Sequence, residues 1–121
     1  GGGNYDPEYF GVNDVWSSSD GIHWRKEVSS ASWHERIWFS SVVFRDCIWV
    51  IGGWSGNPSK NWGDIWYSDN GKDWKKLKTK GNKWKERHEH ATFVFKNKIW
   101  IAGGMTPPLV NDVWSLRFSG D

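Results

Sequence analysis

Apolar and polar positions alternate over short stretches of this chain, and the stretches come in pairs joined by polar residues. Residues 40–44 and 47–51 are rich in β-branched and aromatic side chains and flank Arg45-Asp46, and Lys96-Asn97 separates two similar stretches later in the chain. Such pairs predict antiparallel hairpins with two-residue turns. No stretch has the 3.6-residue apolar period of an amphipathic helix, so the pattern predicts an all-β fold.

Two further hairpins are predicted around glycine-containing turns. Asp20-Gly21 separates "DVWSS" from "HWRKEV", and Asn70-Gly71 separates "DIWYS" from "DWKKL". Asn-Gly is the strongest short hairpin signal, because both residues tolerate a positive φ. The sequence therefore predicts a tight and rigid turn at Asn70-Gly71.

The hairpins belong to a longer internal repeat. Residues 39–53 align without a gap on residues 90–104, at an offset of 51. Residues 13–24 align on 63–74 at an offset of 50, and "NDVW" opens a third copy at 111. The predicted unit has about 50 residues and four short antiparallel strands, as in a β-propeller blade. The chain holds about two and a half units, at 1–32 (partial), 33–83 and 84–121 (partial).

These motifs, taken in order, resemble the kelch family, particularly its Trp-rich bacterial members. The matching residues are the pairs Gly52-Gly53 and Gly103-Gly104, the preceding Trp49 and Trp100, the hairpin-closing Trp24 and Trp74, and Arg87 with His90. The resemblance covers nearly the whole chain, although Phe39 stands where His90 stands in the next copy. It implies kelch-type propeller blades, in which the glycine pair ends the second strand near the central axis. Trp49 and Trp100 are then expected to fill the wedges between neighbouring sheets.

The charge balance excludes some partners. The chain has 16 Lys and Arg against 14 Asp and Glu, a net charge of +2, so neither nucleic acid nor a membrane surface is expected as a partner. The Lys-rich stretch at 75–85 is interpreted as a solvated hairpin and loop. Cys47 is the sole cysteine, which rules out an intrachain disulfide and a cysteine-based metal cluster.

The sequence "HEH" at 88–90 is the one stretch that suggests a metal. His88 and His90 lie on one face of an extended segment together with Glu86. Structural zinc normally needs four ligands, so we prefer another interpretation, in which His90 is a structural residue bonded to the backbone and His88 is solvated. No metal, no cofactor and no catalytic residue is predicted.

Two classes of function remain. The first is a binding module whose propeller face recognises a protein segment or a glycan. The alternative is part of a carbohydrate-processing enzyme, similar to sialic-acid mutarotase or galactose oxidase, which share the kelch fold. The three tyrosines Tyr5, Tyr9 and Tyr67 and the mid-strand Cys47 argue against the copper site of galactose oxidase. A binding module without catalysis is therefore favoured.

The resemblance places the binding surface on the loop after each glycine pair and on the loop before the innermost strand. The predicted ligand-binding residues are Trp54, Trp38, Arg36, Arg87, His88 and Asn57. Exposed Trp beside Arg suits sugars through ring stacking and carboxylates through the guanidinium fork. Trp33 and Trp84 recur at equivalent positions and are interpreted as packing residues, whereas Trp38 and Trp54 have no matching Trp in the other copy.

Counting strands leads to an expectation about assembly. The motifs predict nine strands, which do not divide into four-stranded blades, and closed propellers need about four to eight blades. Either several copies close a ring together, or the remaining blades belong to a longer chain, which the strand count favours. The chain lacks an initiator Met, so we expect it to be processed, trimmed or a piece of a longer protein.

Overall fold

The computed structural model describes residues 1–118, which form eleven β-strands. In chain order these are β1 (Gly2–Asn4), β2 (Phe10–Val12), β3 (Val15–Ser17), β4 (Arg25–Val28), β5 (Ser40–Phe44), β6 (Cys47–Gly56), β7 (Ser59–Ser68), β8 (Lys75–Lys76), β9 (Ala91–Phe95), β10 (Lys98–Ala102) and β11 (Val113–Leu116). The predicted all-β fold is confirmed. Within this range there is no helix that could cross a membrane.

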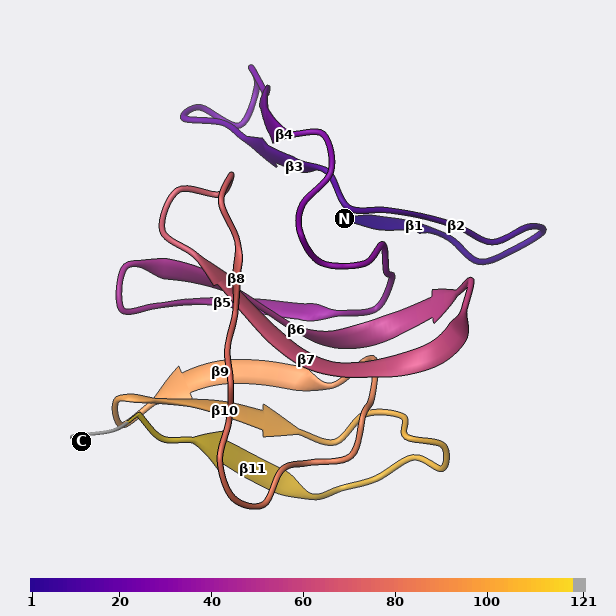
Figure 1. The fold of residues 1–121 in the computed structure, drawn as a ribbon, viewed down its shortest axis with the longest axis vertical. Helices are drawn as coiled ribbons and strands as arrows, with labels where there is room; N and C mark the ends of the chain where they lie inside the picture. The colour runs from indigo at the N-terminus through magenta and orange to yellow at the C-terminus, as the bar shows by residue number, and fades with distance from the viewer. Residues whose placement is uncertain (119–121) are drawn as a thin grey trace.

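The strands form small antiparallel sheets that stack as successive layers (Figure 1). The β1–β2 and β3–β4 hairpins make the first layer, the sheet β5-β6-β7-β8 the second, and the sheet β9-β10-β11 the third. The layers do not close into a ring within residues 1–118. Nine strands were expected and residues 1–118 contain eleven. The two additional strands, β1 and β2, correspond to the outer ends of the long strands β6 and β7.

The two-residue turns are confirmed. Phe44 pairs with Cys47 across Arg45 and Asp46, whose φ angles are 50° and 56°. Phe95 pairs with Lys98 across Lys96 and Asn97, whose φ angles are 49° and 59°. Two consecutive positive φ angles are typical of the type I′ turn, whose twist matches that of the strands it joins.

The tight turn at Asn70-Gly71 is a correction, because residues 69–74 connect β7 to β8. The Ser68 hydroxyl accepts hydrogen bonds from the backbone N–H of Asn70 and Gly71, at 3.2 and 2.8 Å. The Asn70 side-chain oxygen accepts two more from the backbone N–H of Lys72 and Asp73, both at 2.8 Å. These side chains satisfy the backbone locally and so hold a longer loop in place of a two-residue turn.

The glycine pair does not end the second strand of the middle sheet. Strand β6 continues to Gly56, with a register shift between Ile51 and Gly53. Gly52 and Gly53 have φ angles of 65° and 109°, which disfavour any residue with a Cβ. A Cβ on Gly52 would also lie 2.8 Å from the Arg87 carbonyl oxygen in the next unit. The glycines therefore form a bulge where neighbouring units approach closely.

The core lies between the layers. Phe44, Trp49, Ile51 and Ile65 of the middle sheet pack against Trp84, Ile99 and Ile101 of the third layer, and Ala31, Trp33, Val50 and Trp74 form a second cluster toward the first layer. Trp49 fills a wedge between sheets, as expected. Trp100 stacks on the exposed Phe93 on the outer face of the third layer, where no further sheet lies among the described residues, so the expectation for Trp100 stays a prediction.

Candidate functional site

Arg36, a predicted ligand-binding residue, lies inside the fold with no exposed surface. Its guanidinium forms a bidentate pair with the carboxylate of Asp64, at 2.6 and 2.9 Å. It also donates to the carbonyl oxygens of Gly52 and His34, each at 3.0 Å. One side chain therefore ties the segment before β5 to both β6 and β7.

Arg87 repeats this arrangement in the third layer with almost unchanged geometry. It pairs with Asp112 at 2.6 and 2.9 Å and donates to the carbonyl oxygens of Gly103 and Lys85, at 2.9 and 3.1 Å. The expectation of exposed guanidinium groups beside Trp is therefore corrected for both arginines. Their charges are committed to neighbouring carboxylates, which are the natural partners of a buried guanidinium.

The two carboxylates also accept a hydrogen bond from a Trp two residues later, at 2.7 Å from Trp66 and 2.8 Å from Trp114. Burial alone would raise the pKa of Asp64, but the bonds and charge of Arg36 outweigh it, so the pKa is lowered. At the more exposed Asp112 the hydrogen bonds from Arg87 and Trp114 hold the pKa well below its usual range. Both pairs are charged at neutral pH.

Backbone hydrogen bonds fix the two loops that were predicted to form the binding surface. Ile37 and Trp54 exchange N–H···O bonds at 2.8 Å, and His88 and Met105 do the same at 3.1 and 2.9 Å. The N–H of Glu89 donates to the carbonyl of Trp38 in the preceding unit at 2.9 Å. These bonds bring residues of the second and third units together on the side where the β1–β2 and β6–β7 hairpins end (Figure 1).

Five rings meet there and are called the aromatic cluster: Tyr5, Tyr9, Trp38, Trp54 and His88. Trp38 stacks on Trp54 at a centroid distance of 5.5 Å and on His88 at 5.1 Å. Tyr5 contacts both tryptophans, at 5.3 and 5.7 Å, and Tyr9 meets Trp54 edge-on at 5.5 Å. The structure thus brings three of the six predicted site residues, Trp38, Trp54 and His88, into one group.

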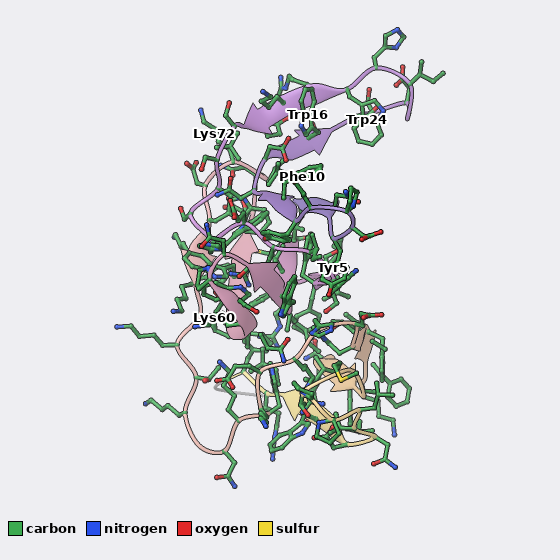
Figure 2. All side chains as sticks on the ribbon, turned by 90° about the vertical axis from the view of Figure 1, so that its right-hand side faces the viewer. Tyr5, Phe10, Trp16, Trp24, Lys60 and Lys72 are labelled. Carbon is green, nitrogen blue, oxygen red and sulfur yellow. The ribbon has the colours of Figure 1, made fainter. Side chains whose placement is uncertain are left out.

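The cluster presents ring surface and hydrogen-bond donors to solvent. Tyr5 is 58% exposed and Trp38 is 37% exposed, and Figure 2 shows Tyr5 on the side of the molecule that faces the viewer. Among the described residues, no hydrogen bond engages the indole N–H of Trp38 or Trp54, as is also the case for Trp24, Trp33 and Trp84, whereas the other seven indoles donate to a protein acceptor. Ring surface combined with unengaged donors is typical of aromatic binding sites.

The backbone does not require an aromatic residue at position 38. Trp38 has a φ of 56°, a left-handed conformation that is unusual for a bulky side chain. Glu89, at the equivalent position of the next unit, has a φ of 55°. Because the fold accepts Glu at the same geometry, the choice of Trp at position 38 is not explained by packing of the repeat.

The two histidines of "HEH" have separate surroundings. His88 was expected to be solvated, but it is buried, stacks on Trp38 and lies 2.5 Å from the Asn61 side-chain oxygen through Nδ1. His90 lies 2.7 Å from the Ser40 hydroxyl through Nε2, and burial lowers its pKa to about 4. Burial also lowers the pKa of His88. No group of three or more His, Cys, Asp or Glu within residues 1–118 is arranged to hold a metal ion.

A hollow of about 610 Å³ adjoins the aromatic cluster through Asn61. Its lining includes Lys60 of β7 and Lys76 and Lys83 of the Lys-rich stretch at 75–85, together with Trp62, Asp64 and Glu86. The Lys60 ammonium lies 4.4 Å from the centre of the Trp62 ring, whose plane stacks on His34 at 4.9 Å. Three ammonium groups against two carboxylates, one of which is held by Arg36, give the hollow a positive character.

The remaining predicted site residue, Asn57, is exposed at the tip of the β6–β7 hairpin, and no described contact joins it to the cluster. Trp33 and Trp84 are buried, in agreement with their interpretation as packing residues. Sequence reasoning missed Tyr5 and Tyr9. The segment after Gly3 is the counterpart of the segment after Gly53, so the same positional rule could have found them.

Comparison with known proteins gives partial matches. No family model matches the chain. It is 32% identical over 69 residues to the protein tag-53 of Caenorhabditis elegans, covering 55% of this chain and 5% of that protein. It is 36% identical over 67 residues to tRNA wybutosine-synthesizing protein 2/3/4 of Oryza sativa subsp. japonica, covering 54% of this chain and 6% of that protein. The chain thus spans about a twentieth of the length of these curated relatives.

Proposed function

We propose that this chain is a carbohydrate-binding module built from kelch-type β-propeller blades, with the aromatic cluster as its ligand site. The observation that carries the proposal is the solvent-facing group of Tyr5, Trp38 and Trp54 at a junction of three units. Aromatic rings bind the C–H faces of sugars, and the free indole N–H groups of Trp38 and Trp54 suit hydroxyl oxygens.

Repetition of the contacts between units supports the blade architecture. Arg36 and Arg87 make the same four kinds of hydrogen bond 51 residues apart, and the N–H of Gly2 and Gly53 donate to their carbonyl oxygens at 3.1 and 2.9 Å. Each unit is thus attached to the next through equivalent bonds, as expected of a propeller or another stacked-repeat array. Other blades, from a longer chain or from further copies, are the partners that this architecture implies.

The electrostatics favour binding over hydrolysis. A glycosidase needs two carboxyl groups with separate roles. Of the carboxylates around the hollow, Asp64 is held by Arg36 and Trp66 in a charged, hydrogen-bonded state. The positive hollow beside Asn61 is placed to receive an acidic substituent of a sugar that stacks on the cluster.

The test uses a glycan array followed by calorimetry with one monovalent oligosaccharide selected from the array. Trp38→Ala and Tyr5→Ala are each expected to weaken binding by about tenfold, because a lost aromatic contact removes roughly 0.5–1.5 kcal/mol beyond its buried area. Trp24→Ala is the matched control, since Trp24 is an exposed Trp remote from the cluster (Figure 2). Unchanged affinity in both cluster variants, or binding of peptides in place of glycans, contradicts the proposal.

A further inference from the structure

Trp24 and Trp74 close equivalent loops but have different surroundings. Trp74 is 8% exposed, meets Trp33 edge-to-face at 5.8 Å and donates its indole N–H to the Gly71 carbonyl. Trp24 is 58% exposed and lies at the extreme end of the molecule, near Trp16 and away from the other sheets (Figure 2). Within residues 1–118, Trp24 of the β3–β4 hairpin therefore lacks a contact like the one that Trp74 makes with Trp33.

The third layer has the opposite feature: the residue equivalent to Trp33 is present, but no described equivalent of Trp74 packs against it. Trp84 is the counterpart of Trp33 and is 7% exposed, but no Trp of the described residues packs against its ring as Trp74 packs against Trp33. It lines a hollow of about 350 Å³ together with Trp114, Leu116 and Phe118. This hollow lies beside β11, whose outer edge pairs with no described strand, whereas the equivalent edge of β7 pairs with β8.

Asp14 is the third carboxylate of the repeat, and no arginine pairs with it among residues 1–118. Asp64 and Asp112 each hold a buried Arg, but Asp14 contacts the ammonium group of Gly1 at 3.5 Å and the indole N–H of Trp16 at 2.9 Å. The sequence "NDVW" is identical at 13–16 and 111–114. Strand β3 thus has the same residues that β11 uses to pair with β10.

The apolar faces at the two ends of the molecule are also complementary. Phe93 and Phe95 are 41% and 55% exposed on the third layer, whereas their counterparts Val42 and Phe44 pack against the core of the next unit. At the other end, Ile48 and Val50 line a hollow of about 520 Å³ together with Val12, Val15 and Trp16. Ile48 and Val50 are the counterparts of Ile99 and Ile101, which the Phe44 face covers within the chain.

We propose that two copies of this chain associate head to tail by strand exchange, with β3 of the second copy replacing β11 beside β10. Ile101, which now pairs with Trp114, then pairs with Trp16 of the second copy in the same register. Arg87 transfers its bidentate pair from Asp112 to Asp14 of the second copy. Trp24 of the second copy then packs against Trp84, as Trp74 packs against Trp33, and the Phe93–Phe95 face covers its Ile48–Val50 hollow. Exchange of equivalent elements between copies of a chain is a low-cost route to association.

In the exchange, β11 competes with β3 of the second copy for the same edge of β10. Equivalent substitutions next to these two strands must therefore have opposite effects on self-association. Asp14→Ala removes the new partner of Arg87 and is expected to weaken self-association by about tenfold, the effect of losing a charged hydrogen-bonded pair. Asp112→Ala weakens the competitor and is expected to strengthen self-association. Sedimentation velocity over a concentration series measures both, and circular dichroism checks that each variant keeps its strand content.

A second pair of variants tests the Trp contact. Trp24→Ala is expected to weaken association by about tenfold or more, whereas Ile22→Ala, in the same loop and 75% exposed, leaves it unchanged. A wild-type chain that stays monomeric throughout the series overturns the proposal, and so do Asp14→Ala and Asp112→Ala effects in the same direction. Trp38→Ala, in the aromatic cluster, does not change the association, so failure of the strand exchange and failure of glycan binding are separate results.

Discussion

Replacing Arg36 with Met removes a buried charge from the middle sheet but keeps most of the volume of its aliphatic stem. Asp64, the partner of Arg36, has a side chain that is only 11% exposed, so water replaces the lost guanidinium less well than at an exposed carboxylate. Removing one partner of a buried pair costs about 3–5 kcal/mol, because the other charge stays buried without compensation. The carbonyls of Gly52 and His34 also lose a donor.

The second copy of this pair offers a matched comparison. Arg87→Met removes the same hydrogen bonds, but its partner Asp112 is 42% exposed and can be solvated. The cost should therefore approach that of lost charged hydrogen bonds, about 1.5–3 kcal/mol. The expected difference between the two variants is about 2 kcal/mol, with Arg36→Met the less stable.

Urea unfolding followed by Trp fluorescence measures the difference, with the slope compared between variants to check that the unfolding transition is unchanged. The double variant Arg36→Met/Asp64→Leu serves as the control, because replacing a whole buried pair by apolar residues is often close to neutral. It should recover part of the stability that Arg36→Met loses. Equal losses for Arg36→Met and Arg87→Met would show that the exposed fraction of the carboxylate does not set the cost, and the desolvation argument would then be refuted.

Two other predictions concern pH and loop strain. Burial lowers the pKa of His90 from 6.5 to about 4. Between these two values the unfolded chain binds a proton at His90 that the folded chain does not bind. The stability that neutral His90 contributes is therefore complete above pH 6.5 and is lost as the pH falls toward 4. When the pH is lowered from 7.5 to 5.5, the free energy of unfolding of the wild-type chain should fall by about 1 kcal/mol more than that of His90→Asn, as measured by urea titrations. Parallel pH profiles of the two proteins would contradict this. Gly71→Val should destabilise the fold by roughly 1 kcal/mol or more and so lower the melting temperature, because φ at Gly71 is 77°. The cost comes from the backbone conformation and not from a clash, since the atoms nearest to a Cβ lie at 3.9 Å. Gly21→Val, at a φ of 76° with open space around it, should cost about the same, and an unchanged melt in Gly71→Val would show that the loop relaxes.

The strand pattern and the short turns could be predicted because they depend on local properties. Arg45-Asp46 lies between two strongly apolar stretches, and only a two-residue connection keeps both in register. The loop around Asn70-Gly71 could not be predicted to this detail, because Ser68 and Asn70 compete for backbone N–H groups through their side chains. The extension of β6 beyond the glycine pair depends on a bulge, which leaves no periodic signal in the sequence.

The site was predictable in part. Trp38 and Trp54 were singled out because they differ from their counterparts in the next unit, and the structure places them in direct contact. The arginines were expected at the surface because the resemblance places the loop before each innermost strand on the binding face. The carboxylate partner of Arg36 lies 28 residues away in the sequence, so burial could be inferred only by noticing that Arg and Asp recur together in both copies.

Comparing equivalent positions of the repeat distinguishes residues whose side chains stabilise the fold from residues whose side chains do not. Arg36 and Arg87, which carry the same side chain in two units, have their polar groups engaged by the same kinds of partner. Positions 38 and 89 share their backbone geometry but carry Trp and Glu. Because the bridging hydrogen bonds at such positions come from the backbone, the side chain can change without loss of the connection between units. Trp38, at the surface and in contact with Trp54, is therefore not needed for that connection, which supports the ligand binding that we propose for the aromatic cluster.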